Sequence, residues 1–421
     1  MRGNSMSTQA ASGRSRGGFP RPGSESVRFS RRSNGGWIRA LLAAVLAALA
    51  ACAAQGSLAA EAGPQGSPAG TAADGLQWPL FRGDRQATGV ARCPLPEKPD
   101  LLWTYSGQKG GYEAAAVIGE GTVYVGSLDG KFSAIDLKTG RPVWEFSTDS
   151  GFNASAALAK GRVLVGDTNG RFHCLDAQTG KERWHFDTEG EINSGANLYG
   201  ERVVFGSQDG YLYCLELDSG KLVWKYQSPN QIRCFPTIVE NRTLVAGCDG
   251  RLHVIDLAEG KEVAGVDLEG PTGSTPAALG SLLFVGTEGK TFFGIDWQQA
   301  KVVWKYANEE RAASFRSSAA VTPDLLVVGS QDRLVHALDP KTGARLWTFA
   351  TRGRVDGSPV IVGDRVFVGS ADGRLYALDA KTGKERWRFE AGGAVVASPA
   401  VAAGRLVVGT DAGDLYCFGQ K

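Results

Sequence analysis

The chain of 421 residues contains few of the residues from which reactive sites are commonly built, with only four His and seven Cys. It has no Cys-x-x-Cys pair and no two adjacent cysteines, so a zinc site is not predicted. It also lacks a nucleophile elbow and a phosphate-binding loop, because its Gly-rich stretches fall at regular hairpin turns. No apolar run reaches 18 residues, which excludes a protein with several membrane-spanning helices.

Positive charge is concentrated at the amino-terminal end. Residues 1–51 contain eight Arg, no Lys and one acidic residue, Glu25, whereas the remaining residues contain 38 basic and 43 acidic side chains. A body without a basic excess has little with which to bind the phosphates of DNA or RNA. Nucleic acid is therefore excluded as a partner of that body.

The first 51 residues have the layout of an export signal. A basic stretch without apolar periodicity precedes twelve small or apolar residues, Ala40 to Ala51, as in secretory signal peptides. A membrane-spanning helix would need about 20 such residues. We therefore predict a signal peptide over 1–51 with a long basic n-region, starting at either Met1 or Met6. Arg31-Arg32 leaves twin-arginine export as an alternative, although no Phe-Leu pair follows it.

The signal segment ends in Leu49-Ala50-Ala51-Cys52, which resembles the lipobox of bacterial lipoproteins. The resemblance implies that Cys52 becomes the first residue of the mature chain and carries the lipid. Residues 52–77 are rich in Ala, Gly, Ser and Pro and are predicted to form a flexible tether, which at about 25 residues would span roughly 25–30 Å. We expect an exported protein, held on the periplasmic face of the outer membrane only by its lipid anchor.

The rest of the chain is one sequence repeat in eight copies. The central small residue of each copy recurs every 40 residues, with one step of 43. Each copy contains four short apolar segments separated by turn residues; in copy 7 these are 358–362, 365–368, 375–379 and 385–389. Four-stranded units at this period are typical of a β-propeller. The central residues are Gly126, Gly166, Gly206, Ala246, Gly286, Gly329, Gly369 and Gly409.

The two ends of the repeat array complement each other. Copy 8 stops at Lys421, just after its third strand, and the missing fourth strand precedes copy 1 as residues 101–105. Trp103 in this segment aligns with the Trp of the other fourth strands. We predict an all-β fold for 78–421: a single eight-bladed propeller of four-stranded blades, in which strand 101–105 completes the last blade and removes the open edges.

The Asp-x-x-Thr-Gly turn and the Gly-Lys-x-x-Trp ending of the copies resemble the tryptophan-docking repeat of the pyrroloquinoline quinone (PQQ) β-propeller superfamily. In that superfamily the Trp of one blade docks against the Gly-containing turn of a neighbouring blade. Copy 4 departs from the pattern, with Val263-Ala264-Gly265 where the Trp belongs, and copy 5 has Gln299-Ala300 in place of Thr-Gly. We expect these two blades to dock less tightly. The docking residues are Trp103, Trp144, Trp184, Trp224, Trp304, Trp347 and Trp387.

Two further segments are interpreted as structural. The lead-in segment 78–84, Trp-Pro-Leu-Phe-Arg-Gly-Asp, resembles that of the same superfamily and is expected to pack against the propeller. An acidic residue recurs just before the last turn of copies 1 to 7, where it can accept backbone N–H bonds. It recurs too often to form one catalytic site. The acidic positions are Asp136, Asp176, Glu216, Asp256, Asp296, Asp339 and Asp379.

One position varies from copy to copy, although the surrounding positions of the repeat are nearly the same in every copy. It opens the first strand of each copy and should face the propeller axis, and it reads Glu113, Asn153, Asn193, Arg233, Gly273, Arg316, Asp356 and Val396. Two interpretations remain open. In one, the position lines a solvent-filled axial funnel that tolerates any polar side chain; in the other, it forms a ring that binds a ligand or peptide. The binding residues would be Glu113, Asn153, Asn193, Arg233, Arg316 and Asp356. Three additional residues near 308–311 lengthen a loop on the same face.

The resemblance implies two competing functions. In PQQ dehydrogenases, Glu and Asn ligate Ca²⁺, Asp acts as a base and Arg polarises the quinone, and the axial ring contains these residue types. Against this reading, the blades lack the long insertions that enclose the cofactor. The blades and lipobox are more similar to outer-membrane protein assembly factor B (BamB) lipoproteins, which have no cofactor. We therefore predict a non-enzymatic, monomeric scaffold for other envelope proteins, without cofactor or metal; a PQQ- and Ca²⁺-dependent dehydrogenase is the alternative.

The remaining Cys and His residues are predicted to be structural. Cys174, Cys214 and Cys417 occupy a third-strand position filled elsewhere by Ala, so they should be small buried thiols. Cys234 and Cys248 share copy 4, where a disulfide is the alternative to free thiols. A neighbouring third-strand position holds His173, His253 and His336 in non-adjacent copies, which favours packing over a shared metal site.

Overall fold

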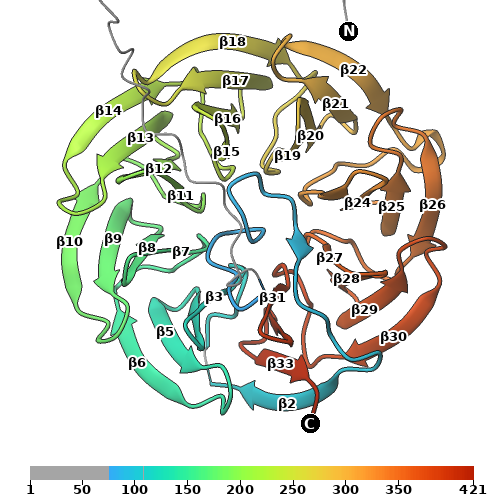
Figure 1. The fold of residues 1–421 in the computed structure, drawn as a ribbon, viewed down its shortest axis with the longest axis horizontal. Coiled ribbons are helices and arrows are strands. Elements are labelled where there is room, and N and C mark those ends of the chain that lie inside the picture. Colours follow the sequence, from blue (N-terminus) through green and yellow to red (C-terminus); the bar gives the residue numbers. More distant parts are fainter. Residues whose placement is uncertain (1–74, 108) are drawn as a thin grey trace, which may run out of the picture. The chain divides into compact units, whose positions relative to one another are not determined.

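The computed structural model describes residues 75–107 and 109–421, which form eight small sheets arranged around a central axis (Figure 1). The predicted all-β, eight-bladed propeller is confirmed. The only helix among the described residues is the short 3₁₀ helix η1 (Glu309–Arg311), and no helix there is long and apolar enough to cross a membrane. The predicted signal peptide, Cys52 and most of the tether lie outside the described residues.

Each blade begins with two strands near the axis. The innermost strands are β3 (Val117–Gly119), β7 (Ala157–Ala159), β11 (Asn197–Tyr199), β15 (Thr237–Val239), β19 (Ala277–Leu279), β23 (Ala320–Thr322), β27 (Val360–Val362) and β31 (Ala400–Ala402). The second strands are β4 (Thr122–Gly126), β8 (Arg162–Gly166), β12 (Arg202–Gly206), β16 (Arg242–Ala246), β20 (Leu282–Gly286), β24 (Leu325–Gly329), β28 (Arg365–Ser370) and β32 (Arg405–Gly409).

The two outer strands complete each blade. The third strands are β5 (Lys131–Asp136), β9 (Arg171–Asp176), β13 (Tyr211–Glu216), β17 (Arg251–Asp256), β21 (Phe292–Asp296), β25 (Leu334–Leu338), β29 (Arg374–Asp379) and β33 (Leu415–Gly419). The outermost strands are β6 (Pro142–Ser147), β10 (Glu182–Asp187), β14 (Leu222–Gln227), β18 (Lys261–Asp267), β22 (Lys301–Tyr306), β26 (Arg345–Ala350), β30 (Glu385–Glu390) and, for the last blade, β2 (Asp100–Tyr105).

The predicted closure of the ring is confirmed. Strand β2 pairs antiparallel with β33, placing Trp103 opposite Cys417, and the last sheet has the order β2-β33-β32-β31. In Figure 1 the β2 arrow, near the blue end of the colour scale, lies directly beside the red β33. The first outer strand of the domain is therefore hydrogen-bonded to its last strand.

The turns within the blades follow from the repeat sequence. At the turn between the second and third strands, Gly130 has a φ of +85°, a conformation that costs glycine little. At the next turn, the backbone N–H of Thr139 donates to Asp136 Oδ1 at 2.7 Å, and equivalent bonds form at Asp176, Asp339 and Asp379. The structural interpretation of the repeated acidic residue is confirmed at these positions.

In seven of the eight repeats, the central glycine lies against an apolar or aromatic side chain of the next blade. A Cβ added to Gly126 would lie 2.3 Å from Phe152 Cβ, and one added to Gly166 would lie 2.2 Å from Ile192. Blade 4 has Ala246 at this position, and the next blade there supplies the smaller Thr272. The close packing between blades thus leaves no room for a side chain at the glycine copies.

The Trp residues dock across the blade interfaces, in the manner the family resemblance implies. Trp103 donates from Nε1 to the carbonyl oxygen of Leu137 at 2.9 Å, and its ring lies over Gly140, where an added Cβ would come within 2.7 Å. Trp387 packs instead on Phe418. The same Trp-on-Gly pairing joins Trp144 to Gly180, Trp184 to Gly220, Trp224 to Gly260, Trp304 to Gly343 and Trp347 to Gly383.

The two departures in copies 4 and 5 meet at one interface. Blade 4 has Ala264 at the position where the other blades have Trp. Without a Trp ring against it, the turn of blade 5 does not need Gly, and Ala300 occupies the Gly position with a φ of +50°. Trp297 of blade 5 is 5 % exposed, and Ala264 and Ala300 pack against the same apolar cluster. The large aromatic ring is therefore supplied from the other side of this interface.

The lead-in segment, residues 75–91, contacts the innermost strands of all eight blades. Its carbonyls accept backbone N–H bonds from the inner hairpins of seven blades, including bonds from Leu158, Ile238 and Ile361. For the remaining blade, Asn197 Nδ2 donates to the carbonyl of Arg85 at 2.9 Å. Its last two residues, β1 (Val90–Ala91), pair in parallel with β27. Figure 1 shows this blue segment crossing the centre of the ring.

Arg82 anchors the lead-in segment. It is 1 % exposed, and its Nη2 donates to the carbonyls of Ala319, at 3.1 Å, and Pro359. Burial lowers the pKa of Arg82 to about 9, with Asp84 partly opposing the shift. The predicted packing role of residues 78–84 is confirmed, since Trp78 is also only 2 % exposed.

Candidate functional site

The variable position of the repeat surrounds one central cavity of about 180 Å³. All eight residues predicted for the axial ring line it: Glu113, Asn153, Asn193, Arg233, Gly273, Arg316, Asp356 and Val396. They do not open the first strands, as the sequence suggested, but lie in the loops about four residues before them. The prediction that they converge is therefore correct, while their role in binding stays a prediction.

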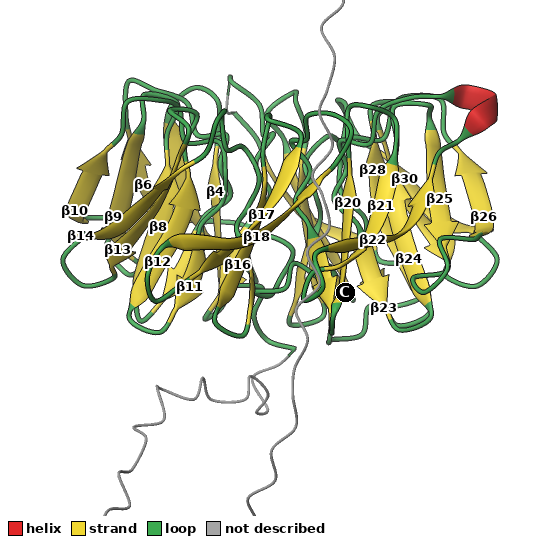
Figure 2. Ribbon diagram, turned by 90° about the horizontal axis from the view of Figure 1, so that it is seen from above, coloured by secondary structure: helices red, strands yellow, loops and turns green. Residues whose placement is uncertain are grey.

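The cavity opens on the face that carries the turns between second and third strands. The inserted residues of blade 6 form η1 on this same face, seen at the upper edge of Figure 2. The chain leading into the propeller contacts the opposite face, where the carbonyl of Gly75 accepts a bond from the N–H of Ala403 in the last inner hairpin. The axial mouth and the attachment of the lead-in segment thus lie at opposite ends of the axis.

The charged side chains of the ring are not equivalent. Asp356 accepts hydrogen bonds from Arg354 Nε at 2.5 Å and from Gln331 Nε2 at 3.3 Å, and Arg316 Nε lies 3.3 Å from Glu288 Oε1. Glu113 is exposed and has no hydrogen bond or ion pair within residues 75–107 and 109–421. Two charges of the ring are therefore neutralised by neighbours on the rim, and Glu113 is not.

Arg233 is the second ring residue whose charge has no opposite partner. Its Nη2 donates to the side-chain oxygens of Gln231, at 2.6 Å, and Gln208, at 3.4 Å. Both acceptors are neutral amides, so these bonds orient the guanidinium without compensating its charge. No ion pair of Arg233 occurs in the described part of the chain.

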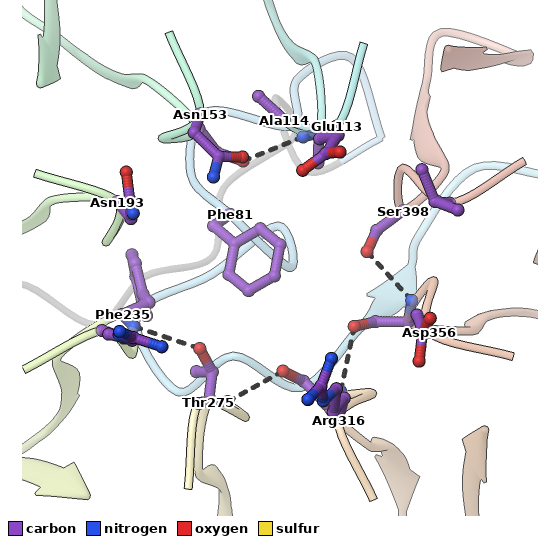
Figure 3. Close-up of a pocket in the computed structure, with 18 residues that line it drawn as sticks. Phe81, Glu113, Ala114, Asn153, Asn193, Phe235, Thr275, Arg316, Asp356 and Ser398 are labelled. Atoms are coloured by element: carbon purple, nitrogen blue, oxygen red, sulfur yellow. Dashed lines mark hydrogen bonds between the residues drawn. The ribbon is translucent and has the colours of Figure 1, made fainter. Parts of the chain in front are cut away.

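The floor of the cavity contains two aromatic residues that the sequence analysis did not place in the site. Figure 3 shows the ring of Phe81 near the centre of the circle of lining residues. It lies 6.0 Å from the ring of Phe235, centroid to centroid. Gly195 leaves space for both, since an added Cβ there would lie 3.3 Å from Phe235 and 3.4 Å from Phe81. The lead-in segment therefore supplies part of the site.

A chain of hydroxyl groups forms the wall below the ring and was also missed. From blade 4 to blade 8, the backbone N–H of one blade donates to the Ser or Thr hydroxyl of the next, at 2.9 to 3.1 Å. The signal in the sequence was the small polar residue two positions after the variable one. The acceptors are Thr275, Ser318, Ser358 and Ser398.

The buried His residues lie outside the cavity and are more than packing residues. His336, which is fully buried, shares hydrogen bonds with Asp332 Oδ2 at 3.0 Å and with Tyr306 Oη at 3.0 Å. His253 is similarly placed between Asp249 and Tyr226, and His173 between Asp167 and Glu182. The interpretation as packing is thus incomplete, because each imidazole also bonds a carboxylate of its own blade. No described group of three or more potential ligands could hold a metal ion.

The thiols behave largely as the sequence indicated. Cys174, Cys214 and Cys417 are buried, and burial raises the pKa of each to about 12, which keeps them protonated. Cys234 and Cys248 are both free, so the alternative of a disulfide is wrong. The Cys234 sulfur lies 3.0 Å from the carbonyl of Ala246, to which it can donate.

The residues of the ring do not fit a Ca²⁺-bound quinone. Pockets for drug-sized ligands usually measure about 300–1,000 Å³, well above the 180 Å³ found here, and Phe81 lies on the axis. The proposed base, Asp356, is already bonded to Arg354, and Arg316 is paired with Glu288. A hard cation needs several converging oxygen ligands, which this arrangement does not provide.

Comparison with known proteins gives a family match over most of the chain. The family model described as "Outer membrane protein assembly factor BamB" matches residues 96–233, 230–347 and 331–421. A search of curated proteins finds no significant match.

Solved structures share the fold at low sequence identity. BamB from Moraxella catarrhalis is 19 % identical, covers 76 % of this chain and 100 % of its own, and has a TM-score of 0.66. The quinohemoprotein alcohol dehydrogenase of Comamonas testosteroni is 18 % identical over 83 % and 82 % of the two chains, with a TM-score of 0.70. A computationally designed protein, Ika8, is 17 % identical over 76 % and 99 %, with a TM-score of 0.69. Because an assembly factor, an oxidoreductase and a designed protein all share it, the fold does not determine function.

Proposed function

Because the chain belongs to the PQQ-like propeller family described as outer membrane protein assembly factor BamB, we propose that it is a non-catalytic scaffold that binds other proteins of the cell envelope. In this proposal the chain is exported, tethered to the periplasmic face of the outer membrane through Cys52, and takes part in outer-membrane protein assembly. The propeller presents rigid surfaces to its partners as a monomer.

The main support for this proposal is the small size of the cavity on the propeller axis. The site where related oxidoreductases would hold a large cofactor is a small cavity with Phe81 at its centre. The connections between strands are short throughout the described residues, and the single inserted segment is η1 with its neighbours. A ring of minimal blades without a cofactor chamber is better suited to presenting surfaces than to enclosing a reaction.

The position of the lead-in segment suggests which face is available to partners. The chain coming from the predicted tether contacts the propeller at Gly75, opposite the axial mouth. The mouth face, which includes the exposed Glu309 and Glu310 of η1, lies at the opposite end of the axis from this contact. We place the partner surface on this face.

Photo-cross-linking in living cells tests the scaffold function. A photoreactive amino acid at position 310, on the mouth face, should give adducts with envelope proteins, and mass spectrometry should identify outer-membrane assembly proteins among them. The matched control is position 324, an exposed site in the β23–β24 hairpin on the opposite face, which should give fewer adducts. Adducts at neither position, or only at position 324, would contradict the proposal.

Replacement of the lipidated residue tests the anchor. Cys52→Ser should move the protein from the membrane fraction to the soluble periplasmic fraction, because the anchor is lipid alone. If the variant stays with the membrane after a carbonate wash, the assignment of Cys52 is wrong.

Calorimetric titration with PQQ, with and without Ca²⁺, tests the alternative. The crowded axis predicts no Ca²⁺-dependent heat. A Ca²⁺-dependent isotherm of micromolar or tighter Kd that disappears in Asp356→Ala would instead establish a quinone site.

A further inference from the structure

The axial cavity contains one negative and one positive side chain that no opposite charge neutralises within the part of the chain that the structure describes. We propose that it binds a small zwitterion, a free amino acid, with the ammonium group held by Glu113 and Asn193 and the carboxylate by Arg233. This inference is independent of the scaffold function, which concerns the outer surfaces of the mouth face.

The distribution of charge around the ring favours a ligand with one positively and one negatively charged end. Going around the axis, the acidic residues Glu113 and Asp356 come from blades 1 and 7, on either side of blade 8. The basic residues Arg233 and Arg316 come from blades 4 and 6, on either side of blade 5. Blades 8 and 5 lie three positions apart in the ring of eight, so the cavity has an acidic side and a basic side. A ligand with one charge of each sign matches this arrangement better than an anion or a cation alone.

The groups left without partners point to the same ligand. Asp356 and Arg316 already have opposite charges beside them on the rim, whereas among the described residues Glu113 has no partner and Arg233 has only neutral ones. An ammonium group would give the Glu113 carboxylate its missing opposite charge, and a carboxylate would do the same for the Arg233 guanidinium, which has five N–H donors.

Asn193 adds an unsatisfied acceptor to the same cavity. Its Nδ2 donates to Glu191 Oε2 at 3.1 Å, but its Oδ1 is buried from solvent and has no hydrogen-bond partner in the described residues. A buried acceptor without a donor costs free energy, and an ammonium group has three N–H donors to offer. Asn193, in blade 3, lies in the ring between Glu113 and Arg233.

The volume of the cavity limits the size of the ligand, and its aromatic floor favours an apolar part in the ligand. A volume of about 180 Å³ corresponds to about six waters at roughly 30 Å³ each, which suits one amino acid and not a longer peptide. Phe81 and Phe235 provide an apolar floor, and the face of an aromatic ring also attracts a cation. The rim groups around the ligand would be Glu191, Gln231, Glu288, Gln331 and Arg354.

Calorimetric titration of the purified full chain with each of the twenty standard amino acids tests the proposal. At least one should bind with a Kd of about 1 mM or tighter, a value that two charge-assisted contacts can supply. Its N-acetyl derivative, which lacks the ammonium group, and its amide, which lacks the carboxylate, should each bind at least tenfold more weakly.

Two charge-neutral variants show which residue holds which end. Glu113→Gln should weaken binding of the amino acid at least tenfold and abolish the preference over the N-acetyl derivative, while the preference over the amide remains. Arg233→Gln should also weaken binding at least tenfold, but it should abolish the preference over the amide and keep the preference over the N-acetyl derivative. Both side chains are exposed, so the variants should fold, which circular dichroism and the Tm can verify.

The control variant is Glu120→Gln, which removes an exposed carboxylate from the same blade at the opposite end of β3 and should bind like the unmodified chain. The proposal is overturned if no amino acid binds with a Kd of about 1 mM or tighter, if the blocked derivatives bind as well as the free amino acid, or if the two ring variants bind unchanged. Loss of envelope cross-links at position 310 without loss of amino-acid binding would contradict the scaffold function alone.

Discussion

Gly343 shows how a single residue of the repeat is constrained from two directions. Its φ is +71°, and an added Cβ would lie 2.6 Å from the ring of Trp304 in the preceding blade. Ala300 has a similar backbone conformation in blade 5, but the blade before it has no Trp. The same turn is therefore intolerant of a side chain at one interface and tolerant of it at another.

We predict that Gly343→Ala lowers the free energy of unfolding by about 2–4 kcal/mol, through left-handed backbone strain and overpacking against Trp304. Ala300→Gly, the matched change in blade 5, should alter it by less than about 1 kcal/mol, since strain relief and loss of chain stiffness oppose each other. Urea unfolding of both variants would measure this. Equal effects in the two would show that the Trp contact is not the cause.

The residues of the site could be predicted only in part from the sequence. The eight ring positions were identifiable because they vary within an otherwise regular repeat, and regular repeats place equivalent residues at equivalent distances from the axis. Phe81 could not be placed in this way, because it precedes the repeat and its position depends on how residues 75–91 cross the ring. Within the described residues, Glu113 and the Oδ1 atom of Asn193 have no partner, and this depends on side-chain geometry that the sequence does not contain.

At the scale of the strand, the third strands of several blades carry a buried polar pair. The pairing with a carboxylate in the turn between the second and third strands holds for His173, His253 and His336, and also for Tyr213 and Tyr376. The sequence analysis found the position but interpreted it as packing, since the alternation of His, Tyr and Phe indicates only a buried aromatic site. The common hydrogen bond explains why polar rings are accepted in the core.

The pair in blade 6 should make stability depend on pH in the acidic range. Burial tends to raise the pKa of Asp332, but hydrogen bonds from His336 and Asn308 outweigh it, and the pKa is lowered overall. A carboxyl group with a lower pKa in the folded state binds fewer protons there, so its stabilisation is present above the unfolded pKa, near 4, and is lost as pH falls below it.

We therefore expect the free energy of unfolding to fall between pH 5 and pH 3, and to fall less in Asp332→Asn, although that variant is less stable at pH 7 because it breaks a buried pair. Asp324→Asn, which removes a carboxylate with 92 % of its side chain exposed, is the control and should keep the full decrease. Guanidinium unfolding at the two pH values would measure the difference. A parallel decrease in all three proteins would argue against a role for Asp332.

At the scale of the whole molecule, the ring is held together by two segments that come early in the domain. Strand β2 completes the last blade, and Trp103 docks that blade onto the first. The lead-in segment connects the inner strands of every blade with hydrogen bonds, and Arg82 joins it to blades 6 and 7. The 40-residue period was sufficient to predict the number of blades and their closure, but not this inner connection, which has no repeat signal.

Removal of the lead-in segment should therefore affect the propeller as a unit. A chain that begins at residue 92 should melt roughly 5–10 °C below one that begins at residue 75, because several hydrogen bonds and the contacts of Arg82 are lost. Scanning calorimetry of the two would measure this, and a broader transition is expected as the blades become less coupled. Identical Tm values would mean that the segment occupies the axis without stabilising it.

The pairing of β2 with β33 also determines when the molecule can finish folding. Trp103 and Cys417 lie opposite each other in one sheet, yet more than three hundred residues separate them along the chain. The ring cannot be sealed until the carboxy-terminal strand has left the ribosome, and contacts of such long range form slowly. Until then the edge of β2 that pairs with β33 has no partner in its sheet, so the last blade is the last part of the ring to be completed.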